Sequence, residues 1–229
     1  MKLKNVYRYP TTVRETIDGK RHYAIKSEKL PSVTTILSAT ESAEKREAQA
    51  RWREAKGEEI ATRIVDESAA RGTAMHKILE KYIFEEGYLD LTTVGRDAHN
   101  MAIRVIEQGL CNVPEYYGTE CTLYYPGLYA GQTDLVAIHK CKDAIIDFKQ
   151  TNKPKKREWI EDYCLQLAAY AMAHNFIYKT KIDKGVIMMC SKDNFYQEFV
   201  VEGLEFQKYK HNFLRRVDEY YQTRSKKTG

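Results

Sequence analysis

Three consecutive runs rich in β-branched and aromatic residues constrain the fold of this chain most strongly. They cover residues 117–125, 128–139 and 144–149, and only Pro126-Gly127 and a polar segment at 140–143 separate them. This composition favours strands, and strands that are joined by such short turns usually pair as antiparallel neighbours. We therefore predict an antiparallel meander of three strands.

Helical patterns flank the predicted meander on both sides. Before it, we expect helices over residues 41–56 and 94–110, and between them a helical pattern broken at Gly57 and at Arg71-Gly72. Further elements follow from the same reasoning: a hairpin around Asp18-Gly19 with strands at 13–17 and 22–25, a helix at 158–178, strands at 185–190 and 195–201, and a helix from 204.

This order of elements predicts a mixed α/β core with a helical region in front of it. A 43% hydrophobic and 30% charged composition excludes a disordered chain, and no stretch approaches the run of about 18 apolar residues that spans a bilayer. We find neither linker nor repeat and expect one domain over 1–229, with a hairpin at 1–29, a helical region at 30–110 and the core at 111–229.

The cysteines indicate a reducing compartment. There are five, an odd number, and none lies two residues from another, so they predict neither a zinc site nor a disulfide framework but free buried thiols. Glu15 and Asp18 are unlike an acid-poor transit peptide. We expect the cytoplasm of a bacterial or phage-infected cell rather than a mitochondrion.

The strongest functional signal is a pair of acids with a lysine on neighbouring predicted strands. Asp147 and Lys149 are two residues apart, so on a strand they project to the same face, whereas Phe148 points to the other. If the strands pair across the short turn, Asp134 lies beside Asp147. Two adjacent carboxylates require a cation, and a hard divalent ion such as Mg²⁺ prefers oxygen ligands.

This set of groups suits hydrolysis of a phosphodiester bond. The ammonium of Lys149 would orient a water molecule and offset charge on a phosphoryl oxygen. A bound metal lowers the pKa of its water from about 16 towards neutrality. The alternative is a simple ion pair at a strand edge. An Asp-x-Lys triplet considered by itself favours this alternative.

The surrounding sequence resembles the RecB-like branch of the PD-(D/E)xK nucleases. Within that branch it is most similar to the mitochondrial genome maintenance exonucleases and their bacterial and phage relatives, over residues 30 to the C-terminus. Thr133 stands where the family name has proline. The matching segments are residues 30–34, 71–76, Glu120, 131–134, 147–149, 153–155 and 166–170.

The resemblance implies a restriction-endonuclease-like core with a central mixed sheet, and an Mg²⁺- or Mn²⁺-dependent exonuclease acting on single-stranded DNA ends. It implies metal ligation by Asp134, Asp147 and the Phe148 carbonyl, with His76 and Glu120 completing or supporting the site. Lys149 becomes the catalytic lysine, and Gln166 and Tyr170 match the QxxxY motif of the DNA-facing surface. For His76 the alternative is a partly buried histidine beside an apolar stripe, and for Gln166 and Tyr170 it is ordinary helix packing.

Two groups of residues are candidates for DNA contacts. The loop after Lys149 carries Lys153, Lys155, Lys156 and Arg157, a position from which cations could meet phosphates. The early helix places Trp52 beside Arg53, a pairing suited to stacking an unpaired base. We add Arg71 to these candidates because it lies in the matched segment 71–76. The alternatives are a solvated turn and a surface helix with one core-facing tryptophan.

Two other functions are alternatives to a metal-dependent nuclease. An iron–sulfur nuclease of the same branch needs a cysteine cluster after QxxxY, where this chain has only Cys190, so we expect no cluster. A nuclease fold without activity, acting as a DNA-binding scaffold, is the alternative from a different class. We expect DNA as the partner, in replication, repair or degradation, with replication or recombination proteins as further candidates and no membrane.

Overall fold

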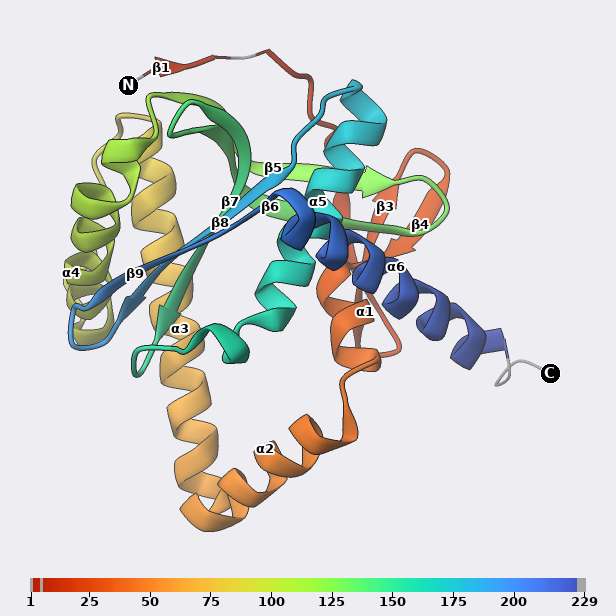
Figure 1. Cartoon of the computed structure of the whole chain (residues 1–229). Coiled ribbons are helices and arrows are strands. Elements are labelled where there is room, and N and C mark those ends of the chain that lie inside the picture. The colour runs from red at the N-terminus through yellow and green to blue at the C-terminus, as the bar shows by residue number, and fades with distance from the viewer. Residues whose placement is uncertain (1, 5, 226–229) are drawn as a thin grey trace.

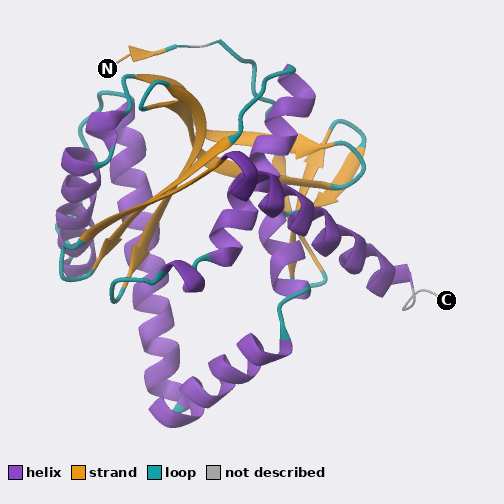
Figure 2. Cartoon of the chain, in the orientation of Figure 1, coloured by secondary structure: helices purple, strands orange, loops and turns teal. Residues whose placement is uncertain are grey.

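A six-stranded mixed sheet forms the centre of the computed structural model, which describes residues 2–4 and 6–225 (Figures 1 and 2). The strand order is β1-β5-β6-β7-β8-β9, with parallel pairs only at β1/β5 and β7/β8. The predicted meander is β5 to β7, and the mixed α/β class is therefore confirmed. The strands are β1 (Lys2–Leu3), β5 (Glu115–Tyr125), β6 (Tyr129–His139), β7 (Lys142–Thr151), β8 (Lys184–Ser191) and β9 (Tyr196–Glu202).

Helices cover both faces of this sheet. On one face, α3 (Glu58–Ile83) and α4 (Thr93–Gln108) pack apolar side chains against Ile146 and Phe148 of β7. On the other, α1 (Val33–Ala39), α5 (Glu161–Tyr178) and α6 (Gly203–Ser225) pack against Ile145 of the same strand. Alternate side chains of β7 thus enter opposite cores, as the period of a strand requires.

A small second sheet precedes the helices. Its strands are β2 (Val13–Ile17), β3 (Lys20–Ile25) and β4 (Glu28–Pro31), and the turn at Asp18-Gly19 has positive φ at both residues, as predicted for a hairpin. Tyr23 and Leu30 pack on Tyr124 and Ala130 at the ends of β5 and β6. This contact holds the small sheet beside one end of the large one.

The predicted break at Arg71-Gly72 is wrong, because α3 continues through it from Glu58 to Ile83. Arg71 is buried, and its Nε donates a hydrogen bond to Gln150 Oε1 at 2.9 Å. A Cβ on Gly72 would lie 3.4 Å from Gln150 Cγ. Contact with β7 therefore outweighs the helix-weakening effect of a glycine, which is about 0.5–1 kcal/mol.

Two other elements and two cysteines differ from expectation. Strand β4 and helix α1 were not predicted, since the β-branched run after Pro31 conceals a helix that begins with Ser32 as its N-cap. The Ser32 hydroxyl accepts a hydrogen bond from Thr35 N at 2.9 Å. All five cysteines are free, but Cys111 and Cys141 are exposed rather than buried.

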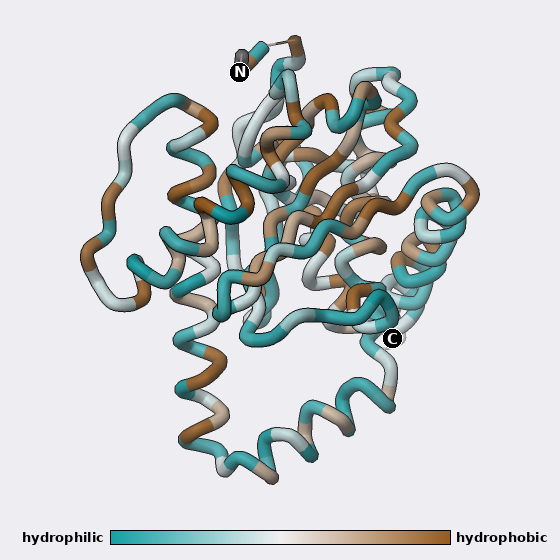
Figure 3. Tube along the Cα trace, turned by 60° about the vertical axis from the view of Figure 1, so that its left-hand side comes forward, coloured by the Kyte–Doolittle hydropathy of each residue, from teal (hydrophilic) through white to brown (hydrophobic). Residues whose placement is uncertain are grey.

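Helix α2 (Ala43–Lys56) and the first half of α3 project away from the sheet (Figure 1). No residue of α2 is buried, and Gly57, with φ of 78°, separates it from α3. Figure 3 shows α2 as mostly hydrophilic, whereas hydrophobic residues gather in the sheet. Among the described residues, no helix combines the length and apolar character needed to cross a bilayer.

Acid stability should depend on one buried histidine of α5. His174 is fully buried, with Nδ1 2.8 Å from Thr180 Oγ1, and burial lowers its pKa to about 4. The unfolded chain, with a histidine pKa of about 6.5, therefore takes up this proton first as the pH falls. The free energy of unfolding should decrease between about pH 6.5 and pH 4, by about 3 kcal/mol from this group.

The variant His174→Gln should lose that part of the pH dependence, because glutamine keeps polar atoms but does not titrate. Urea unfolding followed by circular dichroism at several pH values between 7.5 and 4.5 measures it. His211→Gln, at an exposed position of α6, is the matched control and should follow the parent. An unchanged slope in His174→Gln would show that this ring does not govern acid stability.

Candidate active site

The candidate site forms where β6 and β7 stop pairing. Their ladder ends at Leu135↔Ile146, while β7 continues beside β8 through Phe148↔Met188. The backbone of Phe148 therefore has no backbone partner on β6. Two side chains take the place of that partner: Phe148 N donates to Asp134 Oδ2 at 2.6 Å, and His76 Nε2 donates to Phe148 O at 2.8 Å.

His76 and Glu120 lie beside Asp134. Nδ1 of His76, on α3, is 3.3 Å from Asp134 Oδ1. Glu120, on β5, has a left-handed φ of 51°, and the β5–β6 ladder omits it, passing from Thr119↔Leu135 to Cys121↔Thr133. Its carbonyl instead accepts a hydrogen bond from Gln132 Nε2 at 2.9 Å. One potential ligand atom from each of His76, Glu120 and Asp134 lies within 4.8 Å of the others.

Asp147 and Lys149 share one face of β7, as predicted. The Lys149 ammonium forms an ion pair with Asp147 Oδ2 and lies 5.1 Å from the centre of the Tyr163 ring. Asp147 is only 1% exposed. Apart from this ammonium, none of the described residues 2–4 and 6–225 gives its Oδ2 a hydrogen bond. Lys149 thus supplies the positive charge that compensates this buried carboxylate.

Burial and mutual repulsion set the ionisation of the acids. Burial, with the Asp134 charge, raises the pKa of Glu120 to about 7. Burial also raises the pKa of Asp147 to about 6, although the Lys149 charge opposes it. Asp134 is the exception: burial would raise its pKa, but the charges of His76 and Lys149 hold it below the usual value.

The two basic groups respond in the opposite sense. Burial acts to lower the pKa of His76, but the Asp134 carboxylate outweighs it and raises the pKa to about 9. For Lys149, burial is likewise outweighed by Asp147, so its pKa is raised. Positive charge is therefore stabilised on both sides of the acids.

Helix α5 forms one wall of the site. Gln166 Nε2 donates to the Tyr170 hydroxyl at 3.3 Å, and both residues line a cavity of about 360 Å³ together with the acids. Tyr170 lies directly over Gly131 of β6, where a Cβ would be 2.7 Å from its Cε1. Glycine is needed here because the ring leaves no room for a side chain. Tyr170 thus packs on the sheet and also lines the site cavity, so both predictions for this residue hold together.

The small sheet forms the opposite wall. Arg14 of β2 and Arg21 of β3 line the same cavity as Asp147 and Lys149. Sequence reasoning did not select either arginine, nor Gln132, although Gln132 adjoins the acid motif. No local pattern marks the arginines, since only the packing of the hairpin on β5 and β6 brings them to the site.

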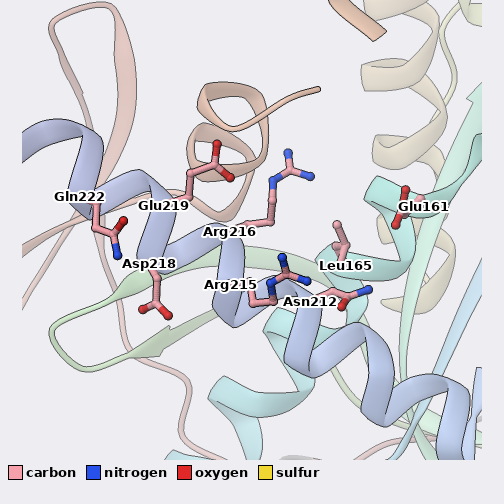
Figure 4. A pocket seen from close by; sticks show the side chains of 8 residues that line it. All are labelled: Glu161, Leu165, Asn212, Arg215, Arg216, Asp218, Glu219 and Gln222. Carbon is pink, nitrogen blue, oxygen red and sulfur yellow. The ribbon is translucent and has the colours of Figure 1, made fainter. Parts of the chain in front are cut away.

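A larger cavity of about 490 Å³ lies along α6 (Figure 4) but lacks comparable chemistry. Its charges are Arg215, Arg216, Asp218 and Glu219 of α6, with Glu161 of α5 opposite. Arg216 donates hydrogen bonds to Leu37 O at 2.6 Å and to Thr40 Oγ1 at 2.5 Å. It therefore binds the end of α1 to α6.

Of the residues predicted to contact DNA, Gln166 and Tyr170 line the site cavity, whereas the others are spread widely outside it. Arg71 is buried with its guanidinium hydrogen-bonded to Gln150 and Asn152, so it joins α3 to β7 and we propose no DNA contact for it. Arg157 is paired with Glu205 at 2.7 Å.

The other predicted contact residues remain at the surface. Lys153, Lys155 and Lys156 lie in the loop between β7 and α5, where Lys156 is over the Trp159 ring at 5.4 Å. On α2, Trp52 is 37% exposed and does not face the core. Arg53 pairs with Glu58 at 2.6 Å. DNA contact by these residues stays a prediction.

The residues at the centre of the site fit a hard divalent cation. Asp134, Asp147 and Glu120 supply carboxylates, and His76 supplies an imidazole. The Phe148 carbonyl, which accepts a hydrogen bond from His76, is a further potential ligand. Oxygen-rich sets of this kind suit Mg²⁺ or Mn²⁺. The structural observation that favours such an ion is that one potential ligand atom from each of His76, Glu120 and Asp134 lies within 4.8 Å of the others.

The acids, lysine and QxxxY residues that carry the sequence resemblance are thus brought together on one mixed sheet. The chain is similar to the PD-(D/E)xK class of nucleases, and a sequence match confirms this resemblance. The chain is 29% identical over 203 residues to mitochondrial genome maintenance exonuclease 1 of Mus musculus. The match covers 83% of this chain and 59% of that protein, so the chain spans less than two thirds of the relative.

Other comparisons add less. No family model matches the chain. A candidate exonuclease from Eubacterium rectale has a TM-score of 0.48 at 10% identity, and the match covers 67% of this chain and 64% of that exonuclease chain. An alkaline exonuclease from Laribacter hongkongensis has a TM-score of 0.31 at 12% identity, covering 69% and 86%. Because both TM-scores are below 0.5, we base nothing further on these structures.

Gly131→Ala should destabilise the protein, because the new methyl group would displace the Tyr170 ring. Overpacking of this kind costs about 1–3 kcal/mol. Gly72→Ala adds the same methyl group in α3, where the nearest atom is 3.4 Å away, and should stabilise the helix by about 0.5–1 kcal/mol. Urea unfolding of both variants tests this pair, and a Gly131→Ala protein as stable as the parent would contradict the observed contact.

Proposed function

We propose that this protein is a divalent-metal-dependent DNA exonuclease that acts at single-stranded ends. The observation that carries the proposal is the buried pair Asp134 and Asp147 with Lys149 beside them, in a cavity that also holds His76 and Glu120. Similarity to a protein named as an exonuclease supports the same activity.

The residues of the chain would divide the work of hydrolysis. Asp134, Asp147, Glu120, His76 and the Phe148 carbonyl would hold Mg²⁺ or Mn²⁺, which supplies a water of lowered pKa and positive charge at the phosphate. Asp134 is held in place by Phe148 N, and His76 by Phe148 O. Both potential ligands are therefore oriented before any ion arrives.

Lys149 would act on the reacting atoms. Its ammonium is held at the cavity by Asp147, from which it can orient the attacking water and stabilise charge on a phosphoryl oxygen. Water adds to phosphorus, the bond to the leaving oxygen breaks, and the proton lost by water balances the one gained by that oxygen. Gln166 and Tyr170 would form the wall against which the strand lies.

Asp147→Asn and Lys149→Met should each reduce turnover of end-labelled single-stranded DNA by about a thousandfold, because each removes a charge that acts at the phosphate. The control is Lys142→Met, at the exposed far end of the same strand. Removal of metal with EDTA should also stop digestion. Circular dichroism and fluorescence anisotropy with labelled DNA verify that the variants still fold and bind.

Three outcomes would contradict the metal mechanism. Digestion that survives EDTA is the first, and full activity of Asp147→Asn or Lys149→Met is the second. The third is tight DNA binding by the parent protein with no digestion under any divalent cation, which would favour the inactive scaffold.

The projecting helices support a preference for single-stranded ends. Helix α2 and the first half of α3 extend beyond the core (Figure 1), and α2 carries exposed Trp52 among cations. We propose that this projection admits a free single strand to the cavity. Exposed aromatic rings stack on unpaired bases, which duplex DNA does not offer.

A linear single strand should therefore be digested at least tenfold faster than a circular strand of the same sequence, or than the corresponding duplex. Densitometry of a gel time course measures all three substrates at equal nucleotide concentration. Equal rates on circular and linear strands would show that the enzyme does not need an end.

The setting of this activity is also proposed rather than established. We propose a role in DNA replication, repair or degradation, with replication or recombination proteins as candidate partners. The mouse relative is named as a mitochondrial protein. For the present chain, the cytoplasm of a bacterial or phage-infected cell is our proposed setting.

A further inference from the structure

A second cavity adjoins the candidate active site and has no part in the chemistry described so far. Its volume is about 660 Å³, compared with about 360 Å³ for the site cavity. The two cavities share four residues as common walls: Arg14, Tyr23, Glu120 and Gln132. A polymer with one unit in the active site could therefore place a neighbouring unit in this second cavity.

Four aromatic side chains contribute to the walls of the second cavity. Tyr9, Tyr23, Tyr117 and Phe84 line it, from the N-terminal segment, β3, β5 and the end of α3. Phe84 is 43% exposed, although its ring is apolar. An aromatic face left open in this way is suited to stacking on a flat ring, and every nucleobase presents one.

A cation stands at the boundary between the two cavities. Arg14 Nη2 donates to Gln132 Oε1 at 3.1 Å, and the guanidinium lies 5.9 Å from the Tyr23 ring centre. Gln132 in turn donates to the Glu120 carbonyl at 2.9 Å, so the arginine is connected to the acid cluster. Within residues 2–4 and 6–225, Arg14 has no carboxylate within ion-pair distance. Its charge is free for an anion.

We propose that this second cavity is a nucleotide-binding subsite next to the cleaved bond. A base stacks on Phe84 beside Tyr117, and Arg14 binds the phosphate that joins this nucleotide to the one in the active site. The inference rests on the proposed nuclease function. It adds the small N-terminal sheet as a positioning element that fixes which phosphate meets Lys149.

Arg14→Gln should raise KM for a labelled single-stranded oligonucleotide about tenfold and change kcat much less, because a charged hydrogen bond to phosphate is lost. Arg14→Lys should recover part of the affinity. The matched control is Arg104→Gln on α4, whose guanidinium pairs with Glu107 at the surface away from both cavities, and it should behave as the parent. Anisotropy with the same oligonucleotide in EDTA gives the affinity without turnover.

Phe84→Ala tests the base contact. A set of oligonucleotides carries one abasic residue at each of the first three positions from either end. At one position the parent should bind and cleave the abasic strand about tenfold less well than the intact strand, because one stacking contact is lost. Phe84→Ala should lose this discrimination. Phe84→Leu, with circular dichroism, checks that any defect comes from the missing ring rather than from misfolding.

The outcomes separate the subsite from the nuclease activity. If the parent does not digest DNA, the nuclease proposal fails, and anisotropy in EDTA still decides whether Arg14 and Phe84 bind a nucleotide. If the parent digests DNA but Arg14→Gln matches Arg104→Gln in both KM and affinity, the subsite is overturned. Equal discrimination against abasic strands by Phe84→Ala and the parent would also overturn it.

Discussion

The two hydrogen bonds on the backbone of Phe148 organise the whole site. A strand that loses its neighbour exposes a donor and an acceptor, and leaving either one buried without a partner is costly. Here Asp134 satisfies the amide and His76 satisfies the carbonyl. The separation of β6 from β7 therefore does two things at once: it opens a cavity between the strands, and it fixes two functional side chains at its edge.

Charge balance inside this cavity depends on that arrangement. Three carboxylates and four basic groups, which include Arg14 and Arg21, line one partly enclosed space, and both aspartates are deeply buried. Burial disfavours every charge, so the acids are tolerated only because Lys149 and His76 lie among them. Asp134 lies against His76 and accepts a hydrogen bond from Phe148 N, so its pKa is lowered despite burial, whereas the pKa of Glu120 and that of Asp147 are raised. The site is thus prepared for additional positive charge.

Periodicity and turn chemistry predicted most of the fold. The meander, the hairpin and the alternation of Asp147 and Lys149 with Phe148 all follow from local patterns, and the structure agrees with them. Local rules failed where distant contacts decide. Gly72 predicts a break, yet Arg71 beside it is hydrogen-bonded to Gln150 of β7 and to Asn152 just after that strand, and the helix continues.

The candidate site shows the same division. The acids and the lysine could be selected because their spacing alone places them on one surface, and the resemblance added His76, Glu120, Gln166 and Tyr170. Arg14 and Arg21 could not be found in this way, since they lie more than 100 residues before the acid pair and only the packing of two sheets unites them. Basic residues near Lys149 in sequence were selected instead, and Arg157 proves to be paired with Glu205.

The continuity of α3 has a mechanical consequence. Its 26 residues form one rod about 39 Å long, which begins at the tip of the helical projection and carries His76 near its other end. A rod without a hinge transmits tilt from one end to the other. A tilt of the projecting tip would therefore reach the imidazole of His76 and, through its hydrogen bond, the carbonyl of Phe148, so that movement outside the core and the geometry of the candidate site are mechanically coupled.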